Sequence, residues 1–240
     1  MTLMSRLVNA TIKRLMRMLC RIDDAQLVQV PAQGPLILVS NHINFLEPPV
    51  FYTNLLPRPM AFFAKAESWD NKLLGLLFDM WGGISLKRGT ADVGAIRLGL
   101  AALEKGSILA VAPEGTRSGD GNLGKGHSGV VIMALRSGAP LLPMACYRHE
   151  DFWDNFTHLR RTDFRIAVGN PFSLQTNGGP ATREMRQQMI DEIMYQIAAL
   201  LPPSYRGVYA NLSEATETYL RFPATSKSNL QQTLDREASL

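Results

Sequence analysis

The amino-acid sequence predicts an α/β protein with a mixed central sheet flanked by helices. Short runs rich in β-branched and aromatic residues alternate with longer stretches of helical periodicity. Hydrophobic residues make up 46% of the 240 residues, enough for a full core in one domain. We expect an N-terminal membrane-associating helical segment (residues 1–30), an α/β domain (31–204) and a polar C-terminal tail (205–240).

The first 21 residues predict a cationic amphipathic helix. At about 100° per residue, one face of this helix carries the apolar residues Met4, Val8, Ile12, Leu15, Met16 and Leu19. The opposite side carries Arg6, Lys13, Arg14, Arg17 and Arg21. The apolar face either enters the headgroup region of an anionic membrane, where each basic residue contributes about 1 kcal/mol, or docks on the protein's own core. We favour the membrane.

The net charge of +4 comes from this N-terminal segment, so the remaining chain is nearly neutral and a nucleic-acid surface is disfavoured. No uncharged apolar run reaches the ~18 residues that a membrane span needs. We therefore expect peripheral attachment to the cytoplasmic face of a membrane. Cys20 and Cys146 lack the spacing of a zinc site or a disulfide framework, so we expect a reducing compartment and no metal.

Predicted strands and helices alternate along the body of the chain. The predicted strands are residues 35–40, 60–65, 84–88, 107–112, 141–147 and 164–169. The predicted helical stretches are 49–56, 71–81, 91–106, 127–138 and 182–201. Thr182 is the expected cap of the last helix, and Pro202 ends it. From residue 205 the chain is polar and weakly periodic, so we expect partial disorder or loose packing there.

The stretch SNHINFLEPP (residues 40–49) follows the first predicted strand, where binding groups collect in open sheets. Histidine is the side chain that ordinarily exchanges a proton near neutral pH, and Glu47 can accept the second ring N–H of His42, which suits a general base. The two residues would lie about 140° apart on an ideal helix, so their contact requires a bend. A histidine beside a carboxylate is also a common structural pair, and this stretch alone leaves both roles open.

The stretch APEGTRS (residues 112–118) follows another predicted strand. Gly115 allows backbone N–H groups to approach a ligand closely, and Thr116 and Arg117 can bind phosphate oxygens. The alternative is a polar turn in which Glu114 pairs with Arg117.

Two further stretches place basic residues beside glycines. GGISLKRG (residues 82–89) contains Arg88, and GKGHSG (124–129) contains Lys125. Both suit an anion, although each residue alone is more typical of solvated surface charge. GKGHSG lacks the GxSxG order, which disfavours a serine hydrolase. We interpret His149 and His158 as loop residues.

Taken in order, these stretches resemble the motifs of the glycerolipid acyltransferase family. NHINFLE resembles its first motif, Asn-His followed by four residues and Asp, and GGISLKR resembles the second. APEGTRS is similar to the third, Phe-Pro-Glu-Gly-Thr-Arg-Ser, and APLLPMA (residues 139–145) is similar to the fourth. Two positions depart from the pattern. Glu47 is one methylene longer than the usual Asp, so its contact with His42 must be remade, and Ala112 replaces an aromatic residue.

The resemblance implies transfer of a fatty acyl group from acyl-CoA or acyl carrier protein to the hydroxyl of a lysophosphatidate-type acceptor, forming phosphatidate in phospholipid synthesis. It implies His42 as the general base and Glu47 as its partner. The implied substrate-binding residues are Arg88, Glu114, Gly115, Thr116, Arg117 and Lys125. Neither a metal nor another cofactor is expected, and anionic membrane lipids are the expected partners. The alternatives are another lysophospholipid or hydroxyl acceptor, or a catalytically weak lipid-phosphate-binding protein.

An acyl chain needs an apolar slot, and LLGLLFDMWGG (residues 73–83) is the candidate for lining it or entering the bilayer. Core packing is the alternative that we favour for this stretch.

Overall fold

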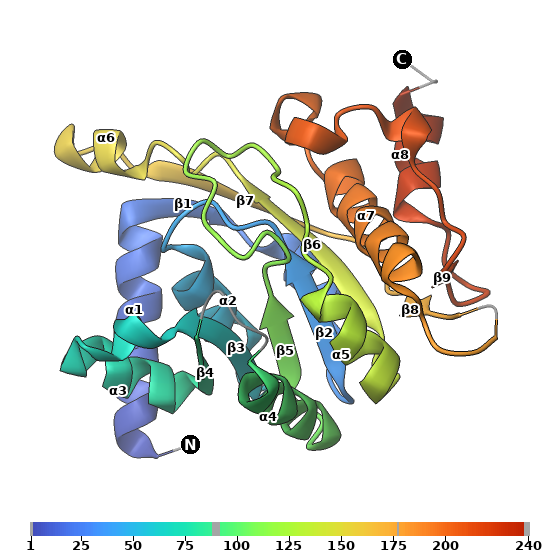
Figure 1. The fold of residues 1–240 in the computed structure, drawn as a ribbon. Helices are drawn as coiled ribbons and strands as arrows, with labels where there is room; N and C mark the ends of the chain where they lie inside the picture. The colour runs from blue at the N-terminus through green and yellow to red at the C-terminus, as the bar shows by residue number, and fades with distance from the viewer. Residues whose placement is uncertain (1, 88–91, 177, 238–240) are drawn as a thin grey trace.

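The computed structural model describes residues 2–87, 92–176 and 178–237. Within these ranges, seven strands form one mixed sheet in the order β1-β7-β6-β2-β5-β3-β4 (Figure 1). The strands are β1 (Cys20–Asp23), β2 (Leu36–Ser40), β3 (Met60–Lys65), β4 (Gly83–Leu86), β5 (Ile108–Val111), β6 (Leu141–Tyr147) and β7 (Thr162–Val168). Strand β7 runs antiparallel to β6, and the other neighbouring pairs are parallel. The mixed sheet expected from the sequence is confirmed.

The central strands β2 and β6 are almost entirely buried, as their continuous apolar runs predict. In the register of the sheet, Ile37 on β2 pairs with Leu109 on β5 and with Leu141 on β6. Because β2 to β6 all run parallel, their carboxyl ends lie at one edge of the sheet. The candidate motifs therefore emerge from the same edge.

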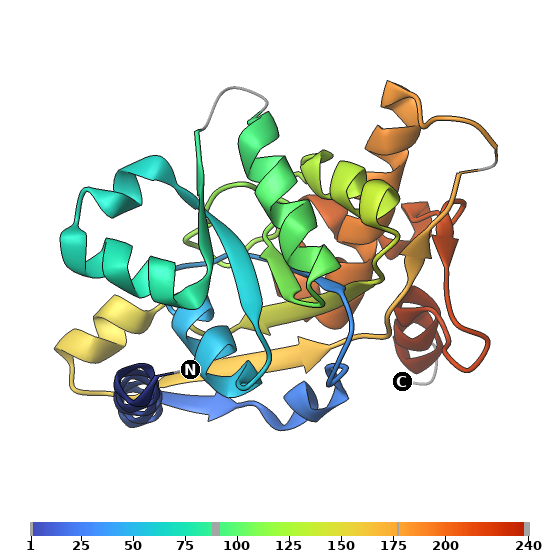
Figure 2. The same cartoon turned by 90° about the horizontal axis from the view of Figure 1, so that it is seen from below.

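Helices cover both faces of the sheet (Figures 1 and 2). One face is covered by α4 (Val93–Glu104), α5 (Gly129–Ser137) and α7 (Arg183–Leu200). The other is covered mainly by α1 (Leu3–Leu19) and α2 (Glu47–Leu55), next to the end of α3 (Lys72–Trp81). The remaining helices are α6 (Phe152–Thr157) and α8 (Asn229–Glu237). Local signals set several ends: Thr182 caps α7 through the N–H of Met185, and Gly82 ends α3 at a φ of 77°.

Helix α1 docks on the protein through one narrow side, on which Asn9 and Met16 are buried. The Asn9 Oδ1 atom accepts a hydrogen bond from the indole N–H of Trp81 at 2.9 Å. The apolar face expected from the sequence is divided, because Met16 is buried whereas Met4 and Leu15 are exposed. Strand β1 follows directly and pairs with β7, so the segment 1–30 is built into the sheet and is not separate from it.

Residues 205–237 are packed against α7, and the expected loose packing of the tail is wrong. The buried residues of this part are Arg206, Tyr209, Leu212, Tyr219, Leu220, Asn229 and Leu230. The buried carboxylate of Glu192 on α7 accepts hydrogen bonds from the backbone N–H groups of Thr218 and Tyr219. Strand β9 (Leu220–Arg221) also pairs with β8 (Ser173–Leu174). Irregularly spaced apolar residues carry this packing, so sequence periodicity did not reveal it.

The packing of this segment predicts the effect of two substitutions. Leu220→Ala should lower the free energy of unfolding by about 2–4 kcal/mol, because it leaves a cavity at a side chain that is only 4% exposed. Val208→Ala, at a side chain that is 68% exposed, should change it by less than about 0.5 kcal/mol. Urea unfolding of both variants measures the difference, and equal effects would contradict the packed arrangement.

Candidate active site

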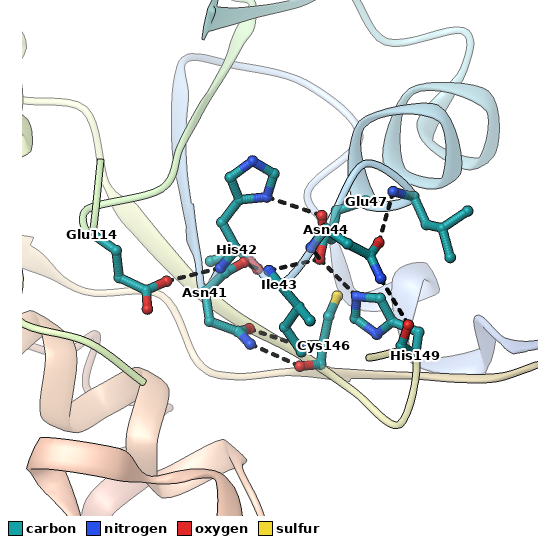
Figure 3. A network of polar contacts seen from close by, with 10 residues as sticks. Asn41, His42, Ile43, Asn44, Glu47, Glu114, Cys146 and His149 are labelled. Carbon is teal, nitrogen blue, oxygen red and sulfur yellow. Dashed lines mark hydrogen bonds and ion pairs between the residues drawn. The ribbon is translucent and has the colours of Figure 1, made fainter. Parts of the chain in front are cut away.

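The bend between β2 and α2 brings His42 and Glu47 together (Figure 3). Glu47 is the first residue of α2, and Pro48 and Pro49 follow in the first turn, where a missing N–H costs no helical hydrogen bond. His42 Nδ1 lies 2.9 Å from Glu47 Oε2. A carboxylate only accepts, so Nδ1 carries the proton and Nε2 is left as the acceptor of the ring. The contact between His42 and Glu47, which requires a bend in the chain, is therefore present.

Glu47 is only 2% exposed, yet its carboxylate is well supplied with donors. The backbone N–H groups of Ile43 and Asn44 donate to Oε1 at 2.8 and 3.0 Å. His149 Nε2 lies 2.6 Å from the same oxygen. Burial by itself raises the pKa of Glu47, but the hydrogen bonds from His149 and His42 outweigh it and lower the pKa to about 2. The carboxylate is therefore ionised at neutral pH.

Sequence reasoning missed His149. We interpreted it as a loop residue, and it does follow β6 in a loop, but its side chain is fully buried and points to Glu47 (Figure 3). The two residues are 102 positions apart, and no local pattern links them. The sheet order is what brings them together, because β6 lies beside β2.

Asn41 fixes the start of the bend to β6. Its side-chain Nδ2 donates to the carbonyl oxygen of Cys146, and its Oδ1 accepts from the Cys146 backbone N–H, both at 2.8 Å. Through these two hydrogen bonds, the Asn41 side chain continues the pairing of β2 with β6 by one residue. Burial raises the pKa of the Cys146 thiol well above its usual value, so we assign it no reactive role.

The loop after β5, which carries APEGTRS, is bound to the same bend. Glu114 Oε2 accepts from the backbone N–H of His42, and Oε1 accepts from that of Gly124, both at 2.8 Å. In return, the backbone N–H of Ser118 donates to the carbonyl oxygen of His42 at 2.8 Å. Glu114 thus holds two loops together, and burial raises its pKa. A direct contact between Glu114 and substrate stays a prediction.

The other predicted residues of this loop lie near the bend and are exposed. Gly115 has a φ of 67°, which favours glycine, and Thr116 and Arg117 follow it on the surface. Within the described residues no ion pair joins Glu114 and Arg117, so the polar-turn alternative is not what the structure contains. Arg88 lies outside the described residues.

Lys125 lines a different pocket from the one that His42 lines. Its neighbours Gly124 and Gly126 donate their backbone N–H groups to Glu114 and to the Tyr209 hydroxyl. The exposed Lys125 lines a groove beside α7 together with Tyr209. The spacing of GKGHSG suggested an anion site. The direction of the Lys125 side chain, however, depends on how this loop packs on the C-terminal part of the chain.

A mostly apolar cavity adjoins His42. Its apolar lining comes from the sheet and α2 and includes Leu38, Phe51, Met60, Phe62, Phe63 and Ala110. The stretch 73–83, which we named as a candidate lining, is not part of it. Helix α3 instead buries Gly75 and Trp81 and exposes Leu73 and Leu76. Core packing, the alternative that we favour for residues 73–83, therefore applies to the buried part of this stretch.

This arrangement can act as a general base beside an apolar pocket. Glu47 fixes the proton of His42 on Nδ1, and Nε2, which has no hydrogen-bond partner among the described residues, points away from Glu47 (Figure 3). Among the described residues, no group of three or more His, Cys, Asp or Glu side chains has the arrangement of a metal site.

A protein-family model described as acyltransferase matches residues 21–147 of the chain. The chain belongs to the acyltransferase family. The match spans more than half of the chain and includes β1 to β6, together with the bend, the cavity and the loop that carries APEGTRS.

Two relatives of this acyltransferase illustrate the similarity. A chloroplastic 1-acyl-sn-glycerol-3-phosphate acyltransferase of Brassica napus is 33% identical over 113 residues, which cover 46% of this chain and 32% of the relative. A lyso-ornithine lipid O-acyltransferase of Pseudomonas aeruginosa is 30% identical over 124 residues, 51% of this chain and 46% of the relative. The matched region thus spans less than half of the length of either relative.

The fold of the acyltransferase is shared with a solved structure. The crystal structure of the 1-acyl-sn-glycerophosphate acyltransferase of Thermotoga maritima matches with a TM-score of 0.56 and 22% identity. The match covers 79% of this chain and 76% of that one. It supports the α/β architecture described above.

The low pKa of Glu47 predicts a pH-dependent stability. Because the folded pKa, about 2, lies below the usual 4.5, ionised Glu47 stabilises the folded state above pH 4.5, and this contribution is lost as the pH falls towards 2. Wild type should exceed Glu47→Gln in free energy of unfolding by about 3 kcal/mol at pH 7, and this difference should shrink between pH 4.5 and pH 2. Urea unfolding at several pH values measures it.

The exposed Glu67 provides the control for this comparison. Glu67→Gln should change the free energy of unfolding by less than about 0.5 kcal/mol at each pH. A wild-type advantage over Glu47→Gln that stays constant down to pH 2 would contradict the assignment.

Proposed function

We propose that the protein transfers a fatty acyl group from the thioester of acyl-CoA or acyl carrier protein to the hydroxyl of a lysophosphatidate-type acceptor, forming phosphatidate. One observation carries the proposal: the Nδ1 proton of His42 is bound by Glu47, and its Nε2, without a hydrogen-bond partner among the described residues, lies next to an apolar cavity. Family membership and the names of the relatives support the same reaction.

In the proposed reaction, His42 Nε2 takes the proton of the acceptor hydroxyl as the hydroxyl oxygen attacks the thioester carbonyl carbon. Collapse of the tetrahedral intermediate breaks the C–S bond, and the leaving thiolate takes the proton from the imidazolium. Glu47 stabilises that imidazolium through Nδ1. General-base assistance of this kind accelerates a reaction by roughly 10²- to 10⁴-fold. The products are an ester and a free thiol.

The acceptor phosphate has its proposed site on the loop after β5. Arg117 and Thr116 are exposed there. The backbone N–H of the neighbouring Ser118 donates to the His42 carbonyl oxygen, so this hydrogen bond connects the loop of the proposed phosphate ligands to the residue that carries the base. Arg88 and Lys125 remain proposed further ligands. Holding the hydroxyl near the thioester contributes several kcal/mol, on the order of the effects known for well-oriented reactants.

The acyl chain has its proposed site in the cavity beside His42. Phe62 and Phe63 of β3 and Phe51 of α2 form part of its wall. Each methylene buried against such a wall contributes about 0.8 kcal/mol. In this proposal the acyl chain occupies the cavity with its thioester carbon near His42 Nε2.

Peripheral association with an anionic membrane belongs to the same proposal. The side of α1 that faces away from the core exposes Leu3, Met4, Leu7, Leu15 and Met18, and the basic residues Arg6 and Arg14 are also exposed. At the same end of the molecule, α3 exposes Leu73 and Leu76, and α6 exposes Trp153 and Phe156 (Figure 2). None of the described helices combines the length and apolar character needed to cross a membrane. Such a surface suits the headgroup region of an anionic membrane, and we place it at the cytoplasmic face.

A different lysolipid acceptor is the second candidate, because one relative is named a lyso-ornithine lipid O-acyltransferase. Both candidates use the same base and the same thioester donor. They differ in whether the acceptor carries a phosphate, so a panel of acceptors with one acyl-CoA distinguishes them.

His42→Ala should reduce thioester-dependent acylation of lysophosphatidate by at least ~10²-fold, because no other group replaces the base. Thiol release from acyl-CoA, together with the mass of the lipid product, measures this. The exposed His158 is the matched control, and His158→Ala should retain wild-type activity. Full activity of His42→Ala would remove His42 from the mechanism, and lipid binding without thiol release in the wild type would favour a non-catalytic lipid-binding protein.

Leu7→Ser combined with Met18→Ser should weaken binding to phosphatidylglycerol-containing vesicles, because it removes two exposed apolar side chains from α1. The matched control is Val93→Ser with Leu98→Ser, which changes two exposed residues of α4 on the opposite face of the sheet. Sedimentation with vesicles at low and high salt measures binding. Equal losses in the two double variants would exclude α1 as the specific contact.

A further inference from the structure

The His149 imidazole makes a contact that the reaction described above does not use. Its Nε2 atom lies 2.6 Å from Glu47 Oε1 (Figure 3). Among the described residues, this is the shortest of the hydrogen bonds that the carboxylate accepts. Glu47 thus lies between two histidine rings, with one ring on each oxygen.

The chemistry of the two partners fixes the tautomer of His149. A carboxylate only accepts, so Nε2 carries a proton. Nδ1 is buried and has no hydrogen-bond partner among the described residues. A proton there as well would create a buried cation with an unpaired donor, which is the costlier state. His149 is therefore a neutral imidazole that donates from Nε2.

Several features of the backbone and its neighbours hold this ring in place. Arg148 has a φ of 70°, an uncommon conformation for a residue other than glycine, and it turns the chain towards the bend immediately before His149. The Asn44 side-chain Nδ2 donates to the carbonyl oxygen of His149 at 2.7 Å. The ring also stacks on Phe164, with centroids 4.1 Å apart and an interplanar angle of 23°.

We propose that His149 is a positioning residue for acyl transfer. By donating to Oε1 it holds the Glu47 carboxylate with Oε2 facing His42 Nδ1, which keeps the His42 proton on Nδ1 and leaves Nε2 free for the acceptor hydroxyl. The assignment of a kinetic role rests on the proposed function. If His149 only filled space in the core, a ring of the same shape without the Nε2–H donor would serve equally well.

Three substitutions at His149 distinguish the effect of the Nε2–H donor from the effect of the shape of the ring. His149→Phe keeps a flat ring without a donor, and His149→Gln places an amide NH₂ near the position of Nε2. His149→Asn places its NH₂ near the position of Nδ1 instead. His149→Phe and His149→Asn should lose about 10²-fold in kcat with little change in KM for the acceptor, while His149→Gln should recover most of that loss. Wild-type kcat in His149→Phe, or equal kcat in His149→Gln and His149→Asn, would overturn the proposal.

A second measurement does not depend on activity. In wild-type protein labelled with ¹⁵N-histidine, long-range ¹H–¹⁵N correlation at neutral pH should show His149 as the Nε2–H tautomer and His42 as the Nδ1–H tautomer. His42→Gln assigns the signals. In His149→Asn the His42 signals should move towards the Nε2–H pattern. Wild-type His42 in the Nε2–H form would overturn the proposal, whereas loss of the proposed function alone would appear as inactive wild type with the predicted tautomers.

Discussion

A buried carboxylate organises this molecule. Glu47 is almost entirely removed from water, and an ionised carboxylate in such a place costs several kcal/mol unless donors replace its hydration. The donors come from three sources: the backbone of the bend at Ile43 and Asn44, the ring of His42, and the ring of His149. Together these donors replace the hydration of the ionised Glu47 carboxylate. The same convergence orients the base, so one set of contacts serves both stability and chemistry.

Strand order explains why the donors converge. Strand β2 carries the bend at its carboxyl end and lies between β5 and β6. The loop after β6 supplies His149 and is joined to the bend through Asn41 and Cys146. The loop after β5 supplies Glu114, which binds the backbone N–H of His42 from the other side. Each neighbour of the central strand therefore contributes one buried side chain, and the base is held from both sides.

Helix α2 connects this chemistry to the surface proposed to meet lipid. It begins at Glu47, lines the apolar cavity with Phe51, and packs against α1, where Lys13 Nζ reaches the Thr53 carbonyl oxygen. Beyond α1 the exposed apolar side chains begin. The side of the sheet covered by α4, α5 and α7 is packed as ordinary core and gives the site its rigid support.

The sequence by itself predicted six strands of the central sheet and most of the helices, and it named His42 and Glu47 as a candidate pair, because apolar runs, prolines and the position after a strand are local signals. It did not predict the edge strand β1 or the helices α6 and α8. It also indicated the family through four short motifs. Tertiary structure decided the rest. His149 lies 102 residues from its partner, Glu114 binds backbone groups of two loops, and Lys125 turns towards α7. The tail expected to be loose is fixed by irregularly spaced apolar residues on α7. These features depend on which strands are neighbours and how loops pack over them, and periodicity along a single chain contains no information on either.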